Sequence, residues 1–341
     1  MLRLLGGLTP REFLRRYWQK RPLFVRHAVE NFPALLELRE LRALAARDDV
    51  ESRIVERRRG KRETRHGPFS TLKLGKSNST VLVNGVNLHV PSAEALLQRF
   101  HFIPQARLDD VMVSYATPGG GVGPHVDRYD VFLLQGPGRR AWRVGRKRFV
   151  VEPGDLLYVP PGVQHDGVAL EHCFTYSIGF RAPRGSELGA AFLDWLHQRG
   201  LPEADYRDPD LEPASAPGLL PHELLRFAAS VLRRIRWSAE DVERFLGEYL
   251  SEPKPHVVFA PGGRRRTLGR SIVRLDPKTR LLYRGRRFFI NGESFTPPRG
   301  ATALRELADR RSAHGSRLAA ARIGGLISDW HKQGYVHLED H

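Results

Sequence analysis

The most constraining feature of this chain is the sequence HVD at residues 125–127, together with a second histidine, His165. Residues i and i+2 of a strand point to the same side, so the side chains of His125 and Asp127 can hold one ion together. His165 follows the turn PPG at residues 160–162. Two imidazoles and one carboxylate form the facial set that holds iron(II) and leaves other coordination positions open. We therefore expect His125, Asp127 and His165 to bind one iron ion from neighbouring strands.

A histidine two residues before an aspartate is common by chance, and a single histidine more often has a structural role than a metal-binding one. The second segment favours the metal interpretation. Gly154 and Asp155 begin a predicted strand, the turn at 160–162 ends it, and His165 lies just beyond. This arrangement resembles the second metal motif of double-stranded β-helix (cupin) barrels.

Many short predicted strands surround the two segments. Within residues 111–117, Met112, Ser114 and Ala116 share one face, and the other residues share the opposite face. Further β patterns cover residues 80–90, 129–135, 140–145, 148–152, 156–159 and 173–181. No helix follows the glycine-rich loop 118–124, so phosphate binding is not expected there. We expect instead that the loop backbone passes close to a buried group. Short strands with glycine and proline turns indicate a barrel or a sandwich.

Helices are predicted on both sides of the strands. Thr9 and Glu12 form a capping box at the start of the first helix. Further helical patterns cover residues 36–47, 186–199, 221–236, 239–250, 301–312 and 316–332, with a linker at 203–217 and a hairpin at 281–290. The predicted fold class is α+β: a double-stranded β-helix domain with N-terminal helices (1–200), a helical region (201–254) and a winged-helix-like domain (255–341).

Composition restricts the class of protein and its partners. The chain has 341 residues, of which 41% are hydrophobic, and we find no membrane-spanning segment. The single cysteine, Cys173, excludes an intrachain disulfide and suits a reducing cytoplasm. The net charge of +17 favours a polyanionic neighbour such as RNA, although it also fits an arginine-rich solvated surface. We interpret the basic segment 57–65 as a solvated hairpin rather than a binding site. Basic residues also gather in the tail, at Arg264, Arg265, Arg266, Arg284, Arg286 and Arg287.

Long segments of the chain closely resemble bacterial ribosomal oxygenases of the JmjC class. The resemblance covers most of residues 8–183, and beyond residue 200 it is mainly architectural. The matching segments are PGGGVGPHVDRYDVF (118–132), QG (135–136), RRAWRVG (139–145), PPG with His165 (160–165), SIGFRAP (177–183), WQKRP (18–22) and HGPF (66–69).

The resemblance implies a protein hydroxylase that depends on iron(II) and 2-oxoglutarate and releases succinate and CO2. The substrate of the family is an arginine of large-subunit ribosomal protein number sixteen, which is hydroxylated at C3. The family is homodimeric, so the helices at 221–250 are expected to form the dimerisation region. Contact with ribosomal RNA and a cytoplasmic location are also expected.

The far carboxylate of 2-oxoglutarate needs a cationic partner, and a guanidinium can bind it through two hydrogen bonds. Strand alternation forbids Arg139 and Arg140 from both facing inward, and the resemblance favours Arg140. Ser114 and Ser177 are candidates for further hydrogen bonds to the co-substrate, or are ordinary strand residues. Candidates for acidic or amide side chains at the mouth, where they would receive a cationic substrate, are Asp130, Gln135 and Asp166, which are otherwise plain surface or turn residues.

The chain departs from the family where the connection between Arg146 and Glu152 is shortened. We expect the metal site to survive this change, since both motifs are whole, but the change leaves the substrate open. Two alternatives therefore remain beside arginine hydroxylation: a histidyl or other protein hydroxylase of the same class, and a nucleic-acid-binding protein with an inactive barrel.

Overall fold

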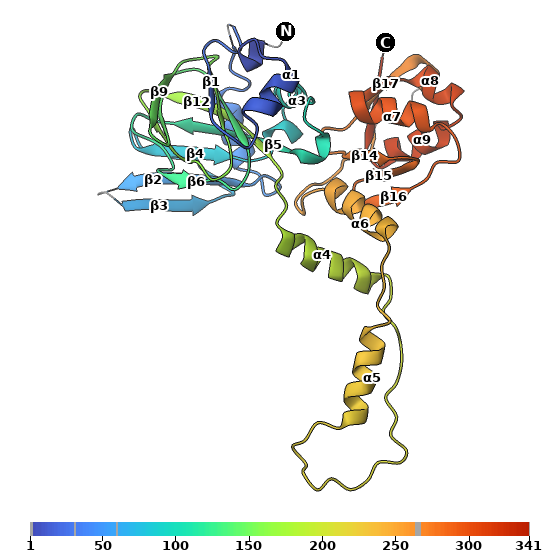
Figure 1. The fold of residues 1–341 in the computed structure, drawn as a ribbon. Coiled ribbons are helices and arrows are strands. Elements are labelled where there is room, and N and C mark those ends of the chain that lie inside the picture. Colours follow the sequence, from blue (N-terminus) through green and yellow to red (C-terminus); the bar gives the residue numbers. More distant parts are fainter. Residues whose placement is uncertain (1–2, 31, 59–60, 263–266, 341) are drawn as a thin grey trace.

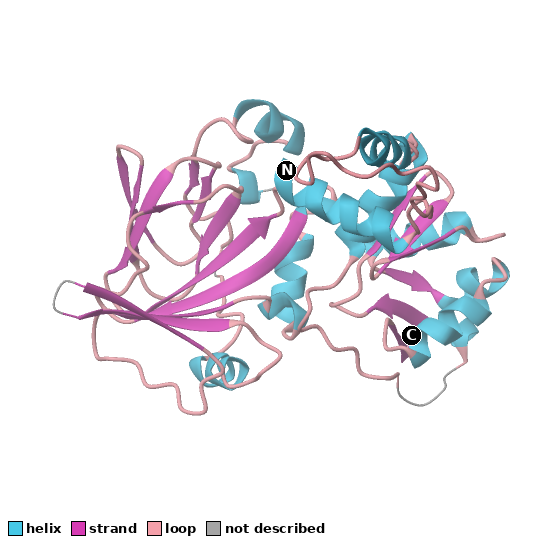
Figure 2. Ribbon diagram, turned by 90° about the horizontal axis from the view of Figure 1, so that it is seen from below, coloured by secondary structure: helices cyan, strands magenta, loops and turns pink. Residues whose placement is uncertain are grey.

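In the computed structural model, which describes residues 3–30, 32–58, 61–262 and 267–340, two antiparallel sheets face each other in the N-terminal half (Figures 1 and 2). The larger sheet has the order β1-β10-β7-β12-β5-β4-β2-β3 and the smaller one β6-β11-β8-β9. The strands of the larger sheet are β1 (Leu23–Val25), β2 (Ser52–Arg58), β3 (Lys61–His66), β4 (Ser79–Val83), β5 (Leu108–Ala116), β7 (Val131–Gln135), β10 (Leu156–Val159) and β12 (Cys173–Phe180). Those of the smaller sheet are β6 (His125–Val126), β8 (Arg140–Val144), β9 (Lys147–Val151) and β11 (Gln164–Ala169).

N-terminal helices pack against the outer face of the larger sheet (Figure 1). Phe13 from α1 contacts Phe132 and Tyr158 of the sheet, with ring centroids 5.4 and 5.1 Å apart. The predicted capping box of α1 is confirmed, because Thr9 and Glu12 bond each other's backbone N–H groups. The elements of this layer are η1 (Arg3–Leu5), α1 (Pro10–Arg16), α2 (Leu38–Ala45), η2 (Val86–Leu88), α3 (Pro91–Gln98) and η3 (Gln105–Arg107).

The strand predictions are confirmed in part. In β5, Val111 and Val113 are fully buried in the core under the helices, as the alternation predicts. The strand expected over residues 80–90 is wrong beyond Val83, where the chain turns into η2. Gly85 has a left-handed backbone (φ 64°), which a regular strand cannot contain.

The C-terminal half contains α4 (Gly185–Gln198), α5 (His222–Leu232) and α6 (Ala239–Ser251), followed by two three-stranded sheets with helices around a separate core. One sheet has β13 (Ser271–Leu275), β17 (Ser312–His314) and β18 (Val336–Asp340), and the other has β14 (Leu281–Arg284), β15 (Arg287–Ile290) and β16 (Glu293–Phe295). The helix predicted over 316–332 is two helices, α8 (Gly315–Ala320) and α9 (Gly324–Lys332), which follow α7 (Ala301–Arg310). Arg322, with a left-handed φ of 56°, interrupts that predicted helix. Within the described residues, no helix is both long enough and apolar enough to cross a membrane.

Two arginines anchor the C-terminal half to the barrel. Arg311 forms an ion pair of 3.0 Å with Glu94 of α3, and both side chains are nearly buried. Arg280 donates to the backbone carbonyl oxygens of Leu108 and Asp109 at 3.4 and 3.1 Å. Because these charged groups are desolvated and matched across the contact, they hold the start of β5 in a defined position against the C-terminal half.

Replacing Tyr158 with phenylalanine is expected to lower the free energy of unfolding by about 1–3 kcal/mol. The Tyr158 hydroxyl donates to fully buried Asp130 at 2.5 Å and accepts from the backbone N–H of Gln19 at 2.8 Å. The substitution leaves the carboxylate of Asp130 and the backbone N–H of Gln19 each without one hydrogen bond inside the protein. Urea denaturation measures the loss, and Tyr115→Phe, which removes a hydroxyl near the surface, is the control. Equal stability of the two variants would contradict the prediction.

Candidate active site

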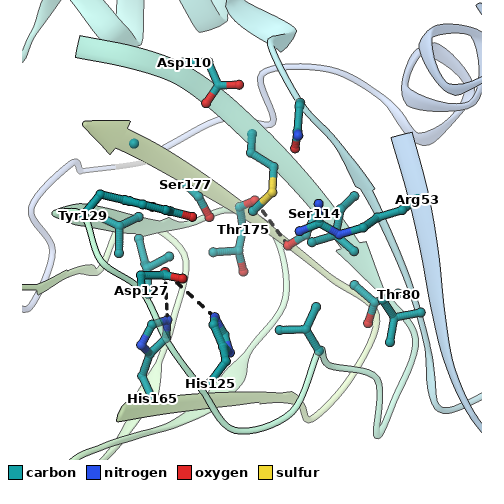
Figure 3. Close-up of a pocket in the computed structure, with 18 of the residues that line it drawn as sticks. Arg53, Thr80, Asp110, Ser114, His125, Asp127, Tyr129, His165, Thr175 and Ser177 are labelled. Carbon is teal, nitrogen blue, oxygen red and sulfur yellow. Dashed lines mark hydrogen bonds and ion pairs between the residues drawn. The ribbon is translucent and has the colours of Figure 1, made fainter. Parts of the chain in front are cut away.

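Three side chains converge beside β6, the edge strand of the smaller sheet, and its neighbour β11 (Figure 3). His125 lies on β6, Asp127 follows two residues later, and His165 on β11 pairs directly with His125 in the antiparallel register. Nε2 of His165 and Nε2 of His125 lie 3.5 and 3.9 Å from a carboxylate oxygen of Asp127. One ligand atom from each residue falls within 4.8 Å of the others, which suits one shared metal ion.

Backbone hydrogen bonds orient both imidazoles. Nδ1 of His125 lies 2.8 Å from the carbonyl oxygen of Gly123, and Nδ1 of His165 lies 3.1 Å from that of Val163. A carbonyl oxygen only accepts, so each Nδ1 carries the hydrogen and each Nε2 keeps a free lone pair toward Asp127. Burial lowers the pKa of His165, which favours the neutral imidazole that binds metals.

The glycine-rich loop before β6 passes through a crowded space, as expected. A Cβ atom on Gly121 would lie 2.3 Å from the carbonyl oxygen of Gly167, and one on Gly120 would lie 2.4 Å from that of Ser79. Only glycine allows the loop to run this close to the backbone of both sheets. The loop thereby brings His125 into register with His165.

A cavity of about 520 Å³ lies between the two sheets and includes the three converging side chains. Both sheets contribute to its walls, as Figure 3 shows for the labelled residues. Its lining residues are Arg53, Val55, Arg62, Thr64, Thr80, Leu82, Asn84, Asp109, Asp110, Met112, Ser114, Val122, His125, Asp127, Tyr129, Val131, Leu133, Arg140, Trp142, His165, Thr175, Ser177, Gly179 and Lys254.

Arg140 faces this cavity from β8, whereas Arg139 is exposed and pairs with Glu171. Only 4% of Arg140 is exposed, and its Nε and Nη2 atoms are buried without a hydrogen-bond partner. Thr80 presents a second buried and unpartnered group, its hydroxyl, to the same cavity. Buried donors without partners are rare in folded proteins, so this part of the cavity is built to receive an acceptor.

Ser114 and Ser177 also line the cavity, and both are buried. The hydroxyl of Ser114 reaches the carbonyl oxygen of Thr175 at the limit of hydrogen bonding, 3.5 Å. Neither Thr80 nor Thr175 was singled out from the sequence, although each stands in a predicted strand. Their neighbours in space come from distant segments, so no local pattern marks them.

Three residues expected at the mouth of the cavity lie elsewhere. Asp130 is fully buried under the N-terminal helices, where it bonds Tyr158 and the side chain of Gln19. Gln135 is also buried and donates to the carbonyl oxygens of Gly138 and Phe174. Asp166 follows His165 directly on β11, so its side chain points to the opposite face, toward Arg143 at 3.8 Å. None of these three candidates therefore lines the cavity.

The basic hairpin is more than the solvated surface predicted for residues 57–65. β2 and β3 pair as a hairpin, as predicted, but Arg62 and Thr64 of β3 line the cavity. Arg53 of β2 lines it as well (Figure 3). The hairpin is therefore part of the cavity wall as well as a solvated surface.

The shortened connection forms a tight hairpin between β8 and β9. Val144 pairs with Lys147, so only Gly145 and Arg146 form the turn, and Gly145 has the positive φ (55°) that such turns require. Among the described residues, those that line the cavity include none from β9. The short connection thus leaves the converging triad intact.

Comparisons with known proteins agree with this architecture. The model of the JmjC domain family matches residues 95–149 and 146–188, and that of the ROXA-like winged helix matches residues 234–337. The ribosomal protein uL16 3-hydroxylase of Escherichia coli (strain K12) is 40% identical over 275 residues, which are 73% of this chain and 73% of that protein. A probable ribosomal oxygenase of Haemophilus influenzae is 37% identical over 208 residues, 53% of this chain and 52% of that protein.

Solved structures show the same fold over nearly the whole chain. YcfD, a ribosomal oxygenase from Escherichia coli, in complex with cobalt and 2-oxoglutarate, matches with a TM-score of 0.82 and 35% identity over 98% of this chain and 99% of that one. These likenesses confirm the predicted barrel and the winged-helix module. The chain belongs to the JmjC-domain family of ribosomal oxygenases.

Proposed function

We propose that this protein is an iron(II)- and 2-oxoglutarate-dependent hydroxylase that adds oxygen to C3 of an arginine in ribosomal protein uL16. The observation that carries the proposal is one cavity with a two-histidine, one-carboxylate set and a buried, unpartnered guanidinium. The relationship to a uL16 3-hydroxylase, 40% identical, supports the substrate.

The residues of the cavity fit both groups. His125, Asp127 and His165 offer the donor set that iron(II) accepts on one face. Arg140 would bind the far carboxylate of 2-oxoglutarate, with Thr80, Ser114 and Ser177 as neighbouring hydroxyl groups. When bound, iron with 2-oxoglutarate supplies the oxidising power that converts a C–H bond to C–OH, with succinate and CO2 as co-products.

The protein's own contribution is to position the target carbon and exclude water. The cavity continues from the triad to Asp110, which Figure 3 shows on the side opposite His125 and His165. A carboxylate there suits the guanidinium of a substrate arginine, and the carbon at the other end of that side chain would then lie toward the metal. The neutral ring of a histidine would gain less from this carboxylate, so arginine is favoured over the histidyl alternative.

The test is mass spectrometry of uL16 after incubation with the protein, iron(II), 2-oxoglutarate and air. One added oxygen on a single arginine, together with succinate, is the expected result. Succinate without added oxygen would keep the oxygenase and reject this substrate. Neither product would favour the nucleic-acid-binding alternative.

A contact with ribosomal RNA is also part of the proposal, and we place it on the β2–β3 hairpin, although the sequence alone favoured a solvated surface there. Arg57 and Lys61 are exposed there, beside the cavity wall, and such basic side chains suit ribosomal RNA next to the substrate protein. The tail is a weaker candidate, because Arg284 and Arg287 pair with Glu243 and Glu240 of α6. Arg264, Arg265 and Arg266 lie outside the described residues.

We further propose that the protein is cytoplasmic and that its chain is divided into an oxygenase domain (1–200), a helical dimerisation region (201–254) and a winged-helix-like domain (255–341). In this division, α5 of the helical region would form the contact of a homodimer. Figure 1 shows α5 extending away from both halves, and within the described chain it has no buried residue. Leu225 and Leu232 are 51% and 66% exposed, and apolar side chains exposed in this way favour a partner surface. We expect light scattering to give a dimer mass for the native protein and a monomer mass for Leu225→Glu. A monomeric native protein would overturn the proposal.

A further inference from the structure

Lys254 reaches the active-site cavity from the C-terminal half of the chain. It stands shortly after α6, and its side chain lines the cavity with residues of the barrel. Its Nζ atom lies 3.4 Å from a carboxylate oxygen of Asp109 and 3.4 Å from one of Asp110. The cavity is therefore completed by a residue that lies outside the barrel.

Asp110 depends on this lysine more than Asp109 does. Asp109 lies within 4.0 Å of Arg181 and Arg280 as well as near Lys254. Asp110 accepts from the backbone N–H of Gly85 at 2.9 Å, and Lys254 is its only ion-pair partner among the described residues. Removal of Lys254 would leave Asp110 without an ion-pair partner within 4 Å among the described residues, beside the like charge of Asp109.

Burial disfavours the charged form of both Asp110 and Lys254, and the charge of each partner opposes this effect on the other. Burial raises the pKa of Asp110; Lys254 opposes the rise and Asp109 adds to it. Burial disfavours the ammonium of Lys254, but Asp110 and Asp109 more than offset this and raise its pKa. The ion pair therefore favours the charged form of both groups.

We propose that Lys254 is a positioning residue that keeps Asp110 charged and fixed at the cavity wall, ready to bind the guanidinium of the substrate. This inference rests on the proposed function, because it assigns Asp110 to an arginine side chain. It also gives the C-terminal half a role at the active site. The contacts of Arg280 and Arg311 with the barrel hold that half where Lys254 can reach Asp110.

The geometry favours support over competition between Lys254 and the substrate. A carboxylate can accept bonds at both oxygens along several directions, so Asp110 can bind Lys254 on one side and a guanidinium on the side of the cavity. If Lys254 instead occupied the substrate's place, its removal would improve substrate binding. The two roles thus predict opposite changes in KM.

The test compares Lys254→Met, which keeps most of the length of the side chain and removes its charge, with Lys254→Arg and the native protein. Hydroxylation of uL16 is followed by mass spectrometry at varied uL16 and varied 2-oxoglutarate. Lys254→Met is expected to raise KM for uL16 by about tenfold or more, with kcat and KM for 2-oxoglutarate nearly unchanged. Lys254→Arg is expected to restore KM. Lys332→Met, on the exposed surface of α9, is the matched control.

The dependence of KM on pH is a second readout that a merely structural role would not affect. In Lys254→Met, KM for uL16 should fall as the pH rises, because loss of the ammonium raises the pKa of Asp110 further and the carboxyl then loses its proton only at higher pH. In the native protein the same fall should lie at lower pH, because Lys254 lowers the pKa of Asp110. The other groups near Asp110 are Asp109 and its partners Arg181 and Arg280, with Tyr129 in the same cavity. Burial, with Asp127 and Asp110, raises the pKa of Tyr129 to about 12, so the Tyr129 hydroxyl stays neutral around neutral pH.

Each outcome decides between these explanations. An unchanged or lower KM for uL16 in Lys254→Met, with an active native protein, would overturn the role of Lys254 and leave the proposed function standing. A parallel loss of kcat, 2-oxoglutarate binding and thermal stability would assign Lys254 to folding alone. A native protein that hydroxylates no arginine would instead overturn the proposed function, and this inference with it.

Discussion

Replacing His125 with alanine is expected to abolish oxygen insertion into uL16 and to weaken iron(II) binding by at least about 100-fold. Loss of a hydrogen bond to a metal ligand alone costs about 10- to 100-fold in affinity or activity, and this substitution removes the ligand itself. The remaining carboxylate and imidazole cannot occupy three neighbouring positions of the metal. Calorimetric titration with the metal and mass spectrometry of uL16 measure the two effects.

The control for this experiment is His197→Ala, which changes an exposed histidine of α4. Its metal affinity and activity should equal those of the native protein. His125 is partly exposed, so thermal stability without metal should change little in either variant. Oxygen insertion that persists in His125→Ala would remove His125 from the metal site and place the reaction elsewhere.

Replacing Arg140 with methionine is expected to weaken 2-oxoglutarate binding by about 2–5 kcal/mol, or roughly 30- to several-thousand-fold. Arg140 is the buried cation of the cavity wall, and loss of its charge leaves the far carboxylate of the co-substrate desolvated and unpaired. The same change should raise the free energy of unfolding of the protein without 2-oxoglutarate by about 1–3 kcal/mol. The reason is that Nε and Nη2 of Arg140 are buried without partners in that state.

Arg139→Met is the matched variant, one residue away on the outer face, where Arg139 pairs with Glu171. It should leave both 2-oxoglutarate binding and stability nearly unchanged, because exposed ion pairs contribute about 0–1 kcal/mol. Co-substrate titration and urea denaturation of both variants test the two effects together. If Arg139→Met weakened 2-oxoglutarate binding more than Arg140→Met, the far carboxylate of 2-oxoglutarate would be assigned to Arg139, and the inward orientation of Arg140 on β8 would be contradicted.

Local patterns in the sequence were sufficient for much of the metal site. His125 and Asp127 share a face because a strand repeats every two residues, and the turn before His165 is marked by proline and glycine. The glycines of the loop at 118–124 likewise predict that its backbone passes close to other atoms. Gly120 and Gly121 confirm this, because each lies close to a backbone carbonyl oxygen of a neighbouring strand. The capping box of α1 is local as well. Each of these features depends on residues a few positions apart.

Residues that act through distant neighbours were not predictable in this way. Asp130 has the charge expected at a cavity mouth, yet the packing of α1 against β10 buries it beside Tyr158. Arg62 was interpreted as a surface residue, and the pairing of β3 with β2 makes it part of the cavity wall.

The sequence by itself determined the metal-binding set, the antiparallel strands that bear it and the helical segments on either side, because periodicity and turn chemistry act over short distances. Only the tertiary structure decided that two side-chain nitrogens of Arg140 are buried without a hydrogen-bond partner, that Thr80 lines the same cavity, and that Lys254 reaches Asp110. Burial and charge pairing depend on which distant segments meet. That meeting results from the packing of the two sheets and the C-terminal half, and no local pattern encodes it.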